Sequence, residues 1–430
     1  MKERIAILGG VRTPIGKAGG VLSDLTAVEL GTHVVKETLA RTAIKKSDVD
    51  ELIMGNVAQP VEAANVSRVI ALRAGLDDHL PAFTVQRNCA SGMQAITSAA
   101  ERILAGGATI CIAGGVEAMS QIPLLYNEDM TAFFYQLSNK RLSSWQRLNV
   151  LMKFRPRYLK PTIGVVKGLT DPVCGLNMGQ TAEVLAREFK ISRSEQDHFA
   201  LASHRKAIAA ERAGHFATEI HPIFTKDKQN TLIKKDEGPR SNQSLTSLAA
   251  LKPYFDRRTG TVTVGNACSI NDGAAAVVLM REKEAKRRKL PCLGYLTAYS
   301  YAALPAHRMG LGPIYATHRL LKETKLLLKN FDLIEINEAF AAQVLANIKA
   351  FTSKKFSETY LNTSKALGSI DESKLNVSGG AIALGHPVGM SGTRLVIHIL
   401  NELQRRKKRR GLATLCVGGG QGAALYLESS

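Results

Sequence analysis

One pattern occurs twice in this chain and limits the folds it can adopt: a strand, a turn of small residues, a helix, and a strand ending in glycines. The first copy comprises PAFTVQRN (81–88), CASGMQAITSAAERILAGG (89–107) and TICIAGGVEAM (109–119), and the helix carries its apolar residues on one face. The second comprises KLNVSGG (374–380), GHPVGMSGTRLVIHILNEL (385–403) and LATLCVGGGQGAALYL (412–427). This repetition predicts an internal duplication into two similar α/β halves.

The residues before the first copy alternate between the periods of strands and helices. IAILGG near the start and ELIMGNV (51–57) are strand-like, whereas 26–40 and 62–75 have helical periodicity. Alternation of this kind predicts a mainly parallel sheet covered by helices.

Size and composition indicate a folded α/β enzyme. The chain has 430 residues, 45% of them hydrophobic, and its 36 glycines show no collagen-like period. No apolar stretch approaches the roughly 20 residues needed to cross a bilayer. The apolar part of MKERIAILGG is too short for a signal-peptide core. We therefore expect a cytoplasmic protein.

The six cysteines contain no CxxC pair, so neither disulfides nor a metal site is expected. Cys89 is the candidate nucleophile because it follows a strand and opens a helix. Unpaired backbone N–H groups and the helix dipole at that place favour the thiolate, which is the reactive form. Small residues follow it and leave room for a thioester. A nucleophile also needs an adjacent base.

His386 is the candidate base, and Cys416 is a second candidate thiol. Glycines on both sides and Pro387 fix the backbone around His386 and allow close approach of a substrate. Cys416 ends a buried strand beside three glycines whose N–H groups are suited to bind an oxyanion. Taken alone, each has a structural interpretation: a turn histidine and a buried core thiol.

Several long blocks resemble the signature motifs of thiolases, the acetyl-CoA acyltransferases. They are NCASGMQA, GNACSINDGAA, NEAFAAQ, GGAIALGHPVGMSGTR and CVGGGQGAA, and the resemblance begins at VRTPIGK. It implies two duplicated halves packed as a five-layer αβαβα sandwich with an inserted loop domain. We expect the first half at 1–121 plus 271–291, the loop domain at 122–270 and the second half at 292–430.

The resemblance also implies catalytic roles. Cys89 would accept the acyl group, His386 would activate it, and Cys416 would move a proton at the α-carbon of acetyl-CoA. Asn337 would hold a water that, with His386, stabilises a thioester oxyanion, and the N–H groups of Cys89 and Gly418 would form a second oxyanion hole. The expected activity is thiolysis of 3-ketoacyl-CoA by coenzyme A, or the reverse Claisen condensation of two acetyl-CoA, with ping-pong kinetics.

Coenzyme A and acyl-CoA are expected as substrates, with no permanently bound cofactor. By resemblance, Cys268 stands at the position of a pantetheine-contacting serine, and Asn177 at that of a histidine. Arg240 aligns with an arginine near the adenine nucleotide, and Phe255 and Phe340 would line the pantetheine tunnel. Family membership implies at least a homodimer, or a tetramer.

The formal charge of +20 indicates anionic partners. Residues 130–170 contain eight Lys or Arg and no Asp or Glu, and 143–154 is a basic amphipathic segment. This insert resembles the extended loop of thiolases from β-oxidation complexes. We expect it to contact an anionic membrane or a partner β-oxidation subunit, or to be a solvated loop that guides coenzyme A phosphates. The run at 405–410 ends a helix, and we do not expect it to bind nucleic acid.

Two other functions are less well supported by the residues. A decarboxylating ketosynthase also uses a cysteine nucleophile, but the CVGGGQG block with Cys416 argues against that group. A catalytically silent lipid- or nucleic-acid-binding protein would not need Cys89, Asn337, His386 and Cys416 together.

Overall fold

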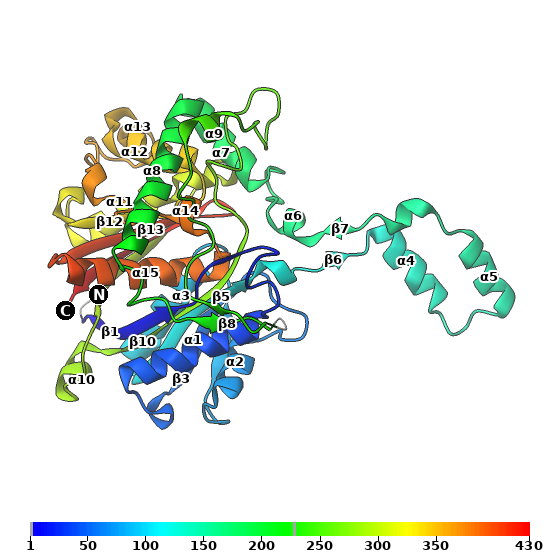
Figure 1. Cartoon of the computed structure of the whole chain (residues 1–430), viewed down its shortest axis with the longest axis horizontal. Coiled ribbons are helices and arrows are strands. Elements are labelled where there is room, and N and C mark those ends of the chain that lie inside the picture. The colour runs from blue at the N-terminus through cyan, green and yellow to red at the C-terminus, as the bar shows by residue number, and fades with distance from the viewer. Residues whose placement is uncertain (1–2, 227–228) are drawn as a thin grey trace.

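Ten strands form one mixed sheet whose order separates the two halves of the chain (Figure 1). The computed structural model describes residues 3–226 and 229–430. The strand order is β4-β3-β5-β10-β1 followed by β11-β14-β13-β12, and the halves meet where β1 pairs antiparallel with β11. The first half contains β1 (Ile5–Arg12), β3 (Glu51–Gly55), β4 (Ala82–Val85), β5 (Ile110–Ala118) and β10 (Asn271–Arg281), with the short β2 (Gly16–Lys17) beside β10. The second half contains β11 (Gly294–Ala303), β12 (Leu333–Ile336), β13 (Arg410–Val417) and β14 (Gln421–Ser429).

Strand order and direction repeat between the halves, which confirms the predicted duplication. In the first half, β1–β10 and β10–β5 are antiparallel, and β5–β3 is parallel. In the second half, β11–β14 and β14–β13 are antiparallel, and β13–β12 is parallel.

Helices cover both faces of each half-sheet, which confirms the predicted five layers. Successive strand residues point to opposite faces. In β1, Ile5 and Ile7 therefore join the central core, whereas Ala6 and Leu8 join an outer one. Between the half-sheets lie α3 (Ser91–Leu104) and α15 (Val388–Arg405). The outer layers contain α1 (Ala27–Thr42) and α2 (Val66–Ala74) on one side, and α11 (Gly312–Thr324) and α12 (Ala341–Thr352) on the other.

Two predictions about the sheet are wrong. Most of its described strand pairs are antiparallel, so the sheet is not mainly parallel. One predicted strand is also not formed. In 374–380, only Leu375 pairs with the sheet, in a single parallel bridge to Ile334. The backbone leaves the extended region at Asn376, whose φ is +44°, and again at Gly379, whose φ is +74°. The Asn376 side chain replaces the missing ladder, since it bonds both the N–H and the carbonyl of Ile336 at 2.9 Å.

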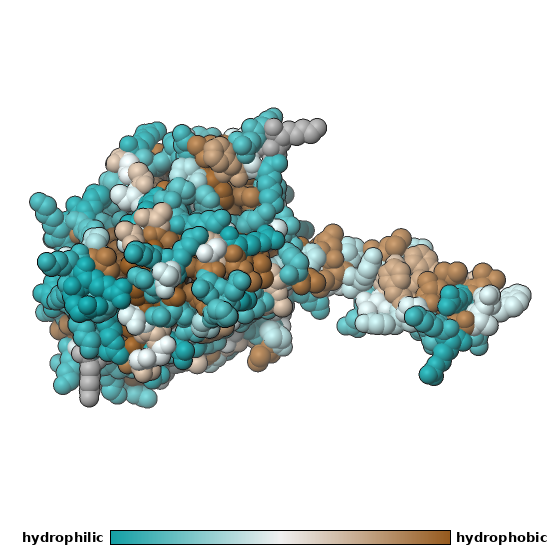
Figure 2. All heavy atoms as spheres, turned by 90° about the horizontal axis from the view of Figure 1, so that it is seen from below, coloured by the Kyte–Doolittle hydropathy of each residue, from teal (hydrophilic) through white to brown (hydrophobic). Residues whose placement is uncertain are grey.

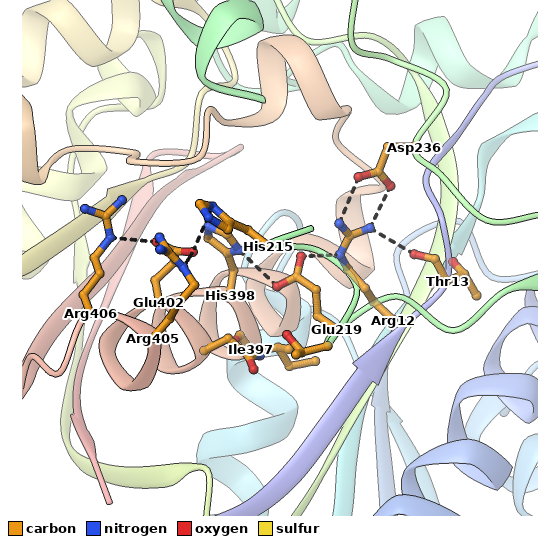
Figure 3. A network of polar contacts seen from close by, with 12 residues as sticks. Arg12, Thr13, His215, Glu219, Asp236, Ile397, His398, Glu402, Arg405 and Arg406 are labelled. Carbon is orange, nitrogen blue, oxygen red and sulfur yellow. Dashed lines mark hydrogen bonds and ion pairs between the residues drawn. The ribbon is translucent and has the colours of Figure 1, made fainter. Parts of the chain in front are cut away.

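A buried ionic network attaches residues 171–270, the segment between the halves, to both of them (Figure 3). Arg12 of β1 contacts Asp236 at 2.7 Å and Glu219 at 2.9 Å. The other oxygen of Glu219 lies 3.0 Å from Nδ1 of His398 on α15. In the same segment lie α7 (Met178–Glu188), α8 (Arg193–Arg212), α9 (Leu245–Ala249) and the pair β8 (Ile223–Phe224) and β9 (Leu232–Ile233).

Residues 122–170 form an arm that projects from the body (Figures 1 and 2). Its aromatic side chains pack on one another: the ring of Phe133 lies 5.5 Å from Phe154, which lies 5.8 Å from Tyr158. The arm contains β6 (Leu124–Leu125), α4 (Glu128–Leu137), α5 (Ser144–Met152), β7 (Thr162–Ile163) and α6 (Gly164–Gly168).

The remaining elements are short. They are α10 (Glu282–Arg287), α13 (Lys354–Tyr360), α14 (Ala381–Leu384), and the 3-10 turns Lys46–Asp48, Met119–Gln121, Pro156–Leu159, Ala306–Leu311, Leu328–Asn330 and Glu372–Lys374. Within residues 3–226 and 229–430, no helix combines the length and the apolar character that a membrane span requires.

Candidate active site

Cys89 lies in the turn between β4 and α3, as the sequence predicted. Asn88 has a φ of +42°, and its Nδ2 donates to the Gly418 carbonyl at 2.8 Å. Ser91 closes the turn by accepting from the Arg87 N–H at 2.9 Å and donating to the Asn88 carbonyl at 2.7 Å. These bonds hold the Cys89 loop against the β13–β14 turn of the other half.

The pKa of Cys89 is shifted against the thiolate that a helix start favours. Burial raises its pKa above the ordinary value, and hydrogen bonds from the backbone N–H groups of Gly418 and Cys89 offset this only in part. The helix-start effect on a thiol is real but is outweighed by the removal of the charged form from water. A thiol in this environment needs an adjacent base to form the thiolate.

Gly418 opens the tight turn between β13 and β14. Gly419 and Gly420 continue it with φ values of +87° and +80°, a conformation that favours glycine. The Gly418 N–H reaches the Cys89 sulfur, which is where a donor is needed to bind a thioester oxygen formed on that sulfur. Cys416, two residues before Gly418, is the second-to-last residue of β13 and is buried. Its pKa is raised well above the ordinary value by burial and by the neighbouring thiols of Cys89 and Cys268.

His386 is buried just before α15 and is held by two hydrogen bonds. Its backbone N–H donates to Oδ1 of Asn271 at 2.9 Å, and its Nδ1 lies 2.6 Å from Oγ of Ser391. The preceding Gly385 has a φ of +111°. Burial and the charge of Arg394 lower the pKa of His386 to about 4, so the imidazole is neutral near pH 7. Among the described residues, Nε2 has no hydrogen-bond partner.

Asn337 follows β12 and is buried at the end of the sheet. Its N–H donates to the carbonyl of Thr414 at 3.0 Å, which places it beside β13, the strand that contains Cys416. Neither its Oδ1 nor its Nδ2 has a partner in the described part of the chain. The equivalent residue at the end of β3 is Asn56, whose Nδ2 bonds the Val116 carbonyl at 2.9 Å and Glu117 at 3.1 Å.

The starts of α3 and α15 meet in the central layer, which brings the Cys89 and His386 turns to the same end of the molecule. A Cβ on Gly92 would lie 2.6 Å from Oγ1 of Thr393 and 2.9 Å from the Gly389 carbonyl. Glu117 bridges the same region, because it accepts from the Gly389 N–H at 2.8 Å and raises the pKa of Cys89 slightly, after burial.

The residues expected to contact coenzyme A divide into two groups. Cys268 and Phe340 share an apolar cluster with Cys416, and Phe255 packs against it with its ring 5.9 Å from that of Phe340. Burial and then Cys89 raise the pKa of Cys268 to about 12. Asn177 is the N-cap of α7 and accepts from the Gln180 N–H at 2.9 Å. Arg240 is exposed, and its N–H bonds His204 at 3.2 Å, away from the thiols.

Sequence reasoning missed the residues that hold His386. Asn271 and Ser391 lie within the motifs SIND and GMSG, but spacing alone did not show that they contact a histidine. Glu117 was read only as part of a strand, and its carboxylate in fact binds three loop N–H groups. A buried carboxylate inside an apolar strand was the available signal.

The candidate site thus combines a half-buried thiol at a helix start, a neutral imidazole, a second, buried thiol and an unpaired amide, a set of groups suited to acyl transfer. The thiolase N-terminal domain family model matches residues 5–283, and the thiolase C-terminal domain model matches 290–429. The 3-ketoacyl-CoA thiolases of Yersinia pestis (strain Pestoides F) and Yersinia pseudotuberculosis (strain YPIII) are each 40% identical over 427 residues, covering 99% of this chain and 97% of theirs.

Solved structures agree in fold over the whole chain. A crystal structure of the Bacillus anthracis acetyl-CoA acetyltransferase has a TM-score of 0.87 at 38% identity and covers 100% of this chain and 99% of that one. Human mitochondrial 3-ketoacyl-CoA thiolase has a TM-score of 0.85 at 35% identity, with coverage of 100% and 99%. A structure of that human enzyme in complex with CoA gives 0.84 and 34%, with coverage of 100% and 98%. The chain belongs to the thiolase family, as its motifs indicated.

Proposed function

We propose that this thiolase cleaves 3-ketoacyl-CoA with coenzyme A to acetyl-CoA and a shortened acyl-CoA, or runs the reverse condensation, through an acyl-Cys89 intermediate. The observation that carries the proposal is the environment of the Cys89 sulfur. Cys89 is half-buried, and its sulfur receives the N–H of Gly418 and lies close enough to Cys416 and Cys268 to affect their pKa values.

In the first half-reaction, the Cys89 thiol loses its proton to Nε2 of His386, and the sulfur attacks the 3-keto carbon. The N–H groups of Cys89 and Gly418 bind the resulting oxyanion. The bond between C2 and C3 then breaks, and Cys416 gives its proton to C2, which releases acetyl-CoA. Asn337 orients a water that, with His386, stabilises the enolate-like oxygen. In the second half-reaction, the Cys416 thiolate takes the proton of the coenzyme A thiol, and the coenzyme A sulfur attacks the thioester carbonyl. The carbon–sulfur bond to Cys89 then breaks, and the Cys89 sulfur recovers the proton held by His386.

Coenzyme A is the second substrate of this proposal, and the described apolar cluster supports its path. Phe255, Phe340 and Cys268 line the approach to the thiols, and Asn177 stands at the same end of α7 as Met178 of that cluster. Arg240 lies further out, where a cation is suited to a nucleotide phosphate. Cys268 is a weaker donor than a serine, so we expect it to bind pantetheine by packing.

Intact-mass spectrometry after mixing with acetyl-CoA tests the acyl-enzyme. C89S is expected to take up no acetyl group. C416S is expected to become acetylated yet lose turnover, because proton transfer at the α-carbon comes after acylation. C174S, a part-buried thiol outside the cluster, serves as the matched control and should behave as the unmodified protein. Acetylation of C89S at the normal rate contradicts the proposal. Thiolysis across 3-ketoacyl-CoA chain lengths then defines the substrate, and activity confined to acetoacetyl-CoA removes the long-chain β-oxidation assignment.

We also propose that the arm contacts an anionic membrane. Trp145, Leu148 and Met152 occupy one face of α5 and are exposed. Figure 2 shows apolar residues gathered on the arm, which stands clear of the body. Tryptophan and cations together suit a headgroup layer. The arm's own aromatic packing leaves this face without a partner in the described residues.

Liposome flotation tests the membrane contact. The protein is expected to float with vesicles containing anionic lipid and to remain below with neutral ones. W145A/L148A/M152A is expected to lose flotation, whereas Q146A/N149A, which changes exposed polar residues of the same helix, should retain it. If no vesicle binds, a partner β-oxidation subunit is the better occupant, or the loop only guides coenzyme A.

We propose that the protein is cytoplasmic and forms a homodimer. In the alternative, two such dimers form a tetramer. The strand β4 supports this, because it ends the strand order and Phe83 is exposed there, which suits pairing with a second copy. Light scattering after size exclusion distinguishes the two states. The three-part domain division stays a prediction.

A further inference from the structure

Ser391 and His386 form the shortest hydrogen bond around the candidate base. Nδ1 of His386 lies 2.6 Å from Oγ of Ser391, and Ser391 Oγ donates to the Pro387 carbonyl at 2.9 Å. Ser391 is fully buried, and His386 is 5% exposed. The two side chains are therefore shielded from bulk water on the side of Nδ1.

The direction of each hydrogen bond follows from the number of protons. A serine hydroxyl has one hydrogen, and a carbonyl oxygen only accepts. Because Ser391 gives its hydrogen to Pro387, its oxygen accepts the hydrogen on Nδ1 of His386. A neutral imidazole carries one proton, so Nε2 keeps its lone pair. That nitrogen has no partner in the described chain and is the one free to take a proton.

The first half contains an equivalent serine, Ser91, whose hydroxyl accepts a hydrogen bond from a different partner. Gly92 and Gly392 contact each other's helices, so Ser91 and Ser391, which precede them, occupy equivalent places. Ser91 accepts a backbone N–H, that of Arg87, at 2.9 Å. In the second half this acceptor instead faces the imidazole of His386. One serine thus orders a loop, and its counterpart orders a titratable side chain.

We propose that Ser391 is a positioning residue that fixes the Nδ1–H tautomer of His386, and so holds Nε2 as the base toward the Cys89 thiol. This inference rests on the proposed role of His386 as the base. Asn271 complements it from β10, because its Oδ1 fixes the His386 backbone at 2.9 Å and leaves the ring to Ser391.

The test combines S391A with S391T, which restores a hydroxyl, and S357A, which removes a fully buried hydroxyl from α13. S391A is expected to lower kcat of thiolysis at least about 10-fold, in line with the loss of one buried hydrogen bond and a mixed tautomer. The KM for coenzyme A should change less than threefold. S391T should recover most of kcat, and S357A should match the unmodified enzyme.

Nitrogen-15 NMR of labelled histidine supplies a readout that a structural role would not change. The unmodified enzyme should show a protonated Nδ1 and an unprotonated Nε2 for His386, and S391A should show both tautomers. Normal kcat and an unchanged tautomer in S391A overturn the inference. H386N separates this failure from that of the proposed function: if H386N acylates Cys89 at the normal rate, the proposed base is wrong, whereas slow H386N with normal S391A rejects Ser391 alone.

Discussion

Gly92 on α3 and Gly392 on α15 face each other in the central layer. A Cβ on Gly392 would lie 2.6 Å from the Met93 nitrogen and 3.3 Å from the Gly92 carbonyl carbon, and a Cβ on Gly92 would lie 2.6 Å from Thr393 Oγ1. Neither helix can accept a larger residue here without moving away from the other. Since Cys89 precedes one helix and His386 precedes the other, this contact sets the spacing of the two loops.

Gly92→Ala is therefore expected to reduce both activity and stability. Overpacking of a tight buried site costs about 1–3 kcal/mol, which thermal or urea unfolding would measure. Gly168→Ala on α6 is the control, because a Cβ there meets nothing within 4 Å, and it should be neutral. An unchanged kcat in Gly92→Ala would show that this helix contact does not set the geometry of the site.

Asn337→Ala is expected to separate activity from stability. Its two amide atoms are buried without a partner among the described residues, so their removal breaks no described hydrogen bond. The free energy of unfolding should stay within about 1 kcal/mol, while kcat falls by about 10²–10³-fold if the amide supports an oxyanion. Asn347→Ala, which removes an amide bonded to Gly310 and Ile314, should instead destabilise the protein. Retained kcat in Asn337→Ala would reject its role.

The rate at which iodoacetamide alkylates Cys89 should be low at pH 7 and rise with pH. Burial raises the pKa of this thiol, so the thiolate fraction grows only above the ordinary range. The rate is measured by peptide mass spectrometry between pH 6 and about 10, where the ordinary thiol value of about 8.5 is the reference. A plateau of fast alkylation already present at pH 6 would instead indicate a thiolate–imidazolium pair.

Glu219→Gln is expected to destabilise the fold strongly. It leaves the buried Arg12 and His398 without the carboxylate that bonds both. Removing one partner of a buried ion pair costs about 3–5 kcal/mol, measurable by urea denaturation. Glu323→Gln, which breaks the exposed i,i+4 pair with Arg319, should cost about 0.5 kcal/mol or less. Equal effects of the two changes would show that the network contributes little.

The same network gives stability two opposite pH dependences. Burial alone would raise the pKa of Glu219, but His398 and Arg12 lower it to about 2. Its contribution is therefore fully present above the unfolded-state value of about 4.3 and is lost as pH falls from there through the folded-state pKa of about 2. Burial would lower the pKa of His398, but Glu219 raises it. Its contribution is therefore present below about 6.5 and is lost as pH rises through the raised pKa. The difference in unfolding free energy between the normal chain and Glu219→Gln should be largest between these limits.

Much of the fold was predictable because its signals are local. The helix expected at 26–40 appears as α1 (Ala27–Thr42), whose apolar period matches the face it buries. The strand expected at 51–57 appears as β3 (Glu51–Gly55), a short run that is buried on both faces. The strand expected at 374–380 failed because Asn376 adopts a positive φ and satisfies Ile336 with its side chain. The alternation of residues in the sequence did not reveal that the Asn376 side chain would take the place of backbone pairing.

For the site, the sequence supplied residue types but not charge states. The position of Cys89 at a helix start was predicted, yet its pKa rises because burial, which depends on segments far along the chain, outweighs the helix end. Asn271 lies 115 residues from His386 and meets it only through the fold. Such contacts carry no periodicity and were found only in three dimensions.

The asparagines at the ends of β3 and β12 are equivalent residues of the two duplicated halves, but their side chains are bonded differently. The side-chain N–H groups of Asn56 donate to Val116 and Glu117, whereas the side-chain amide of Asn337 has no hydrogen-bond partner among the described residues. Asn56 uses both hydrogens of Nδ2 within the chain and so has no donor left for a ligand, although its Oδ1 has no partner among the described residues. The two copies therefore keep the same residue at this position but differ in whether its side-chain N–H groups are already bonded within the chain.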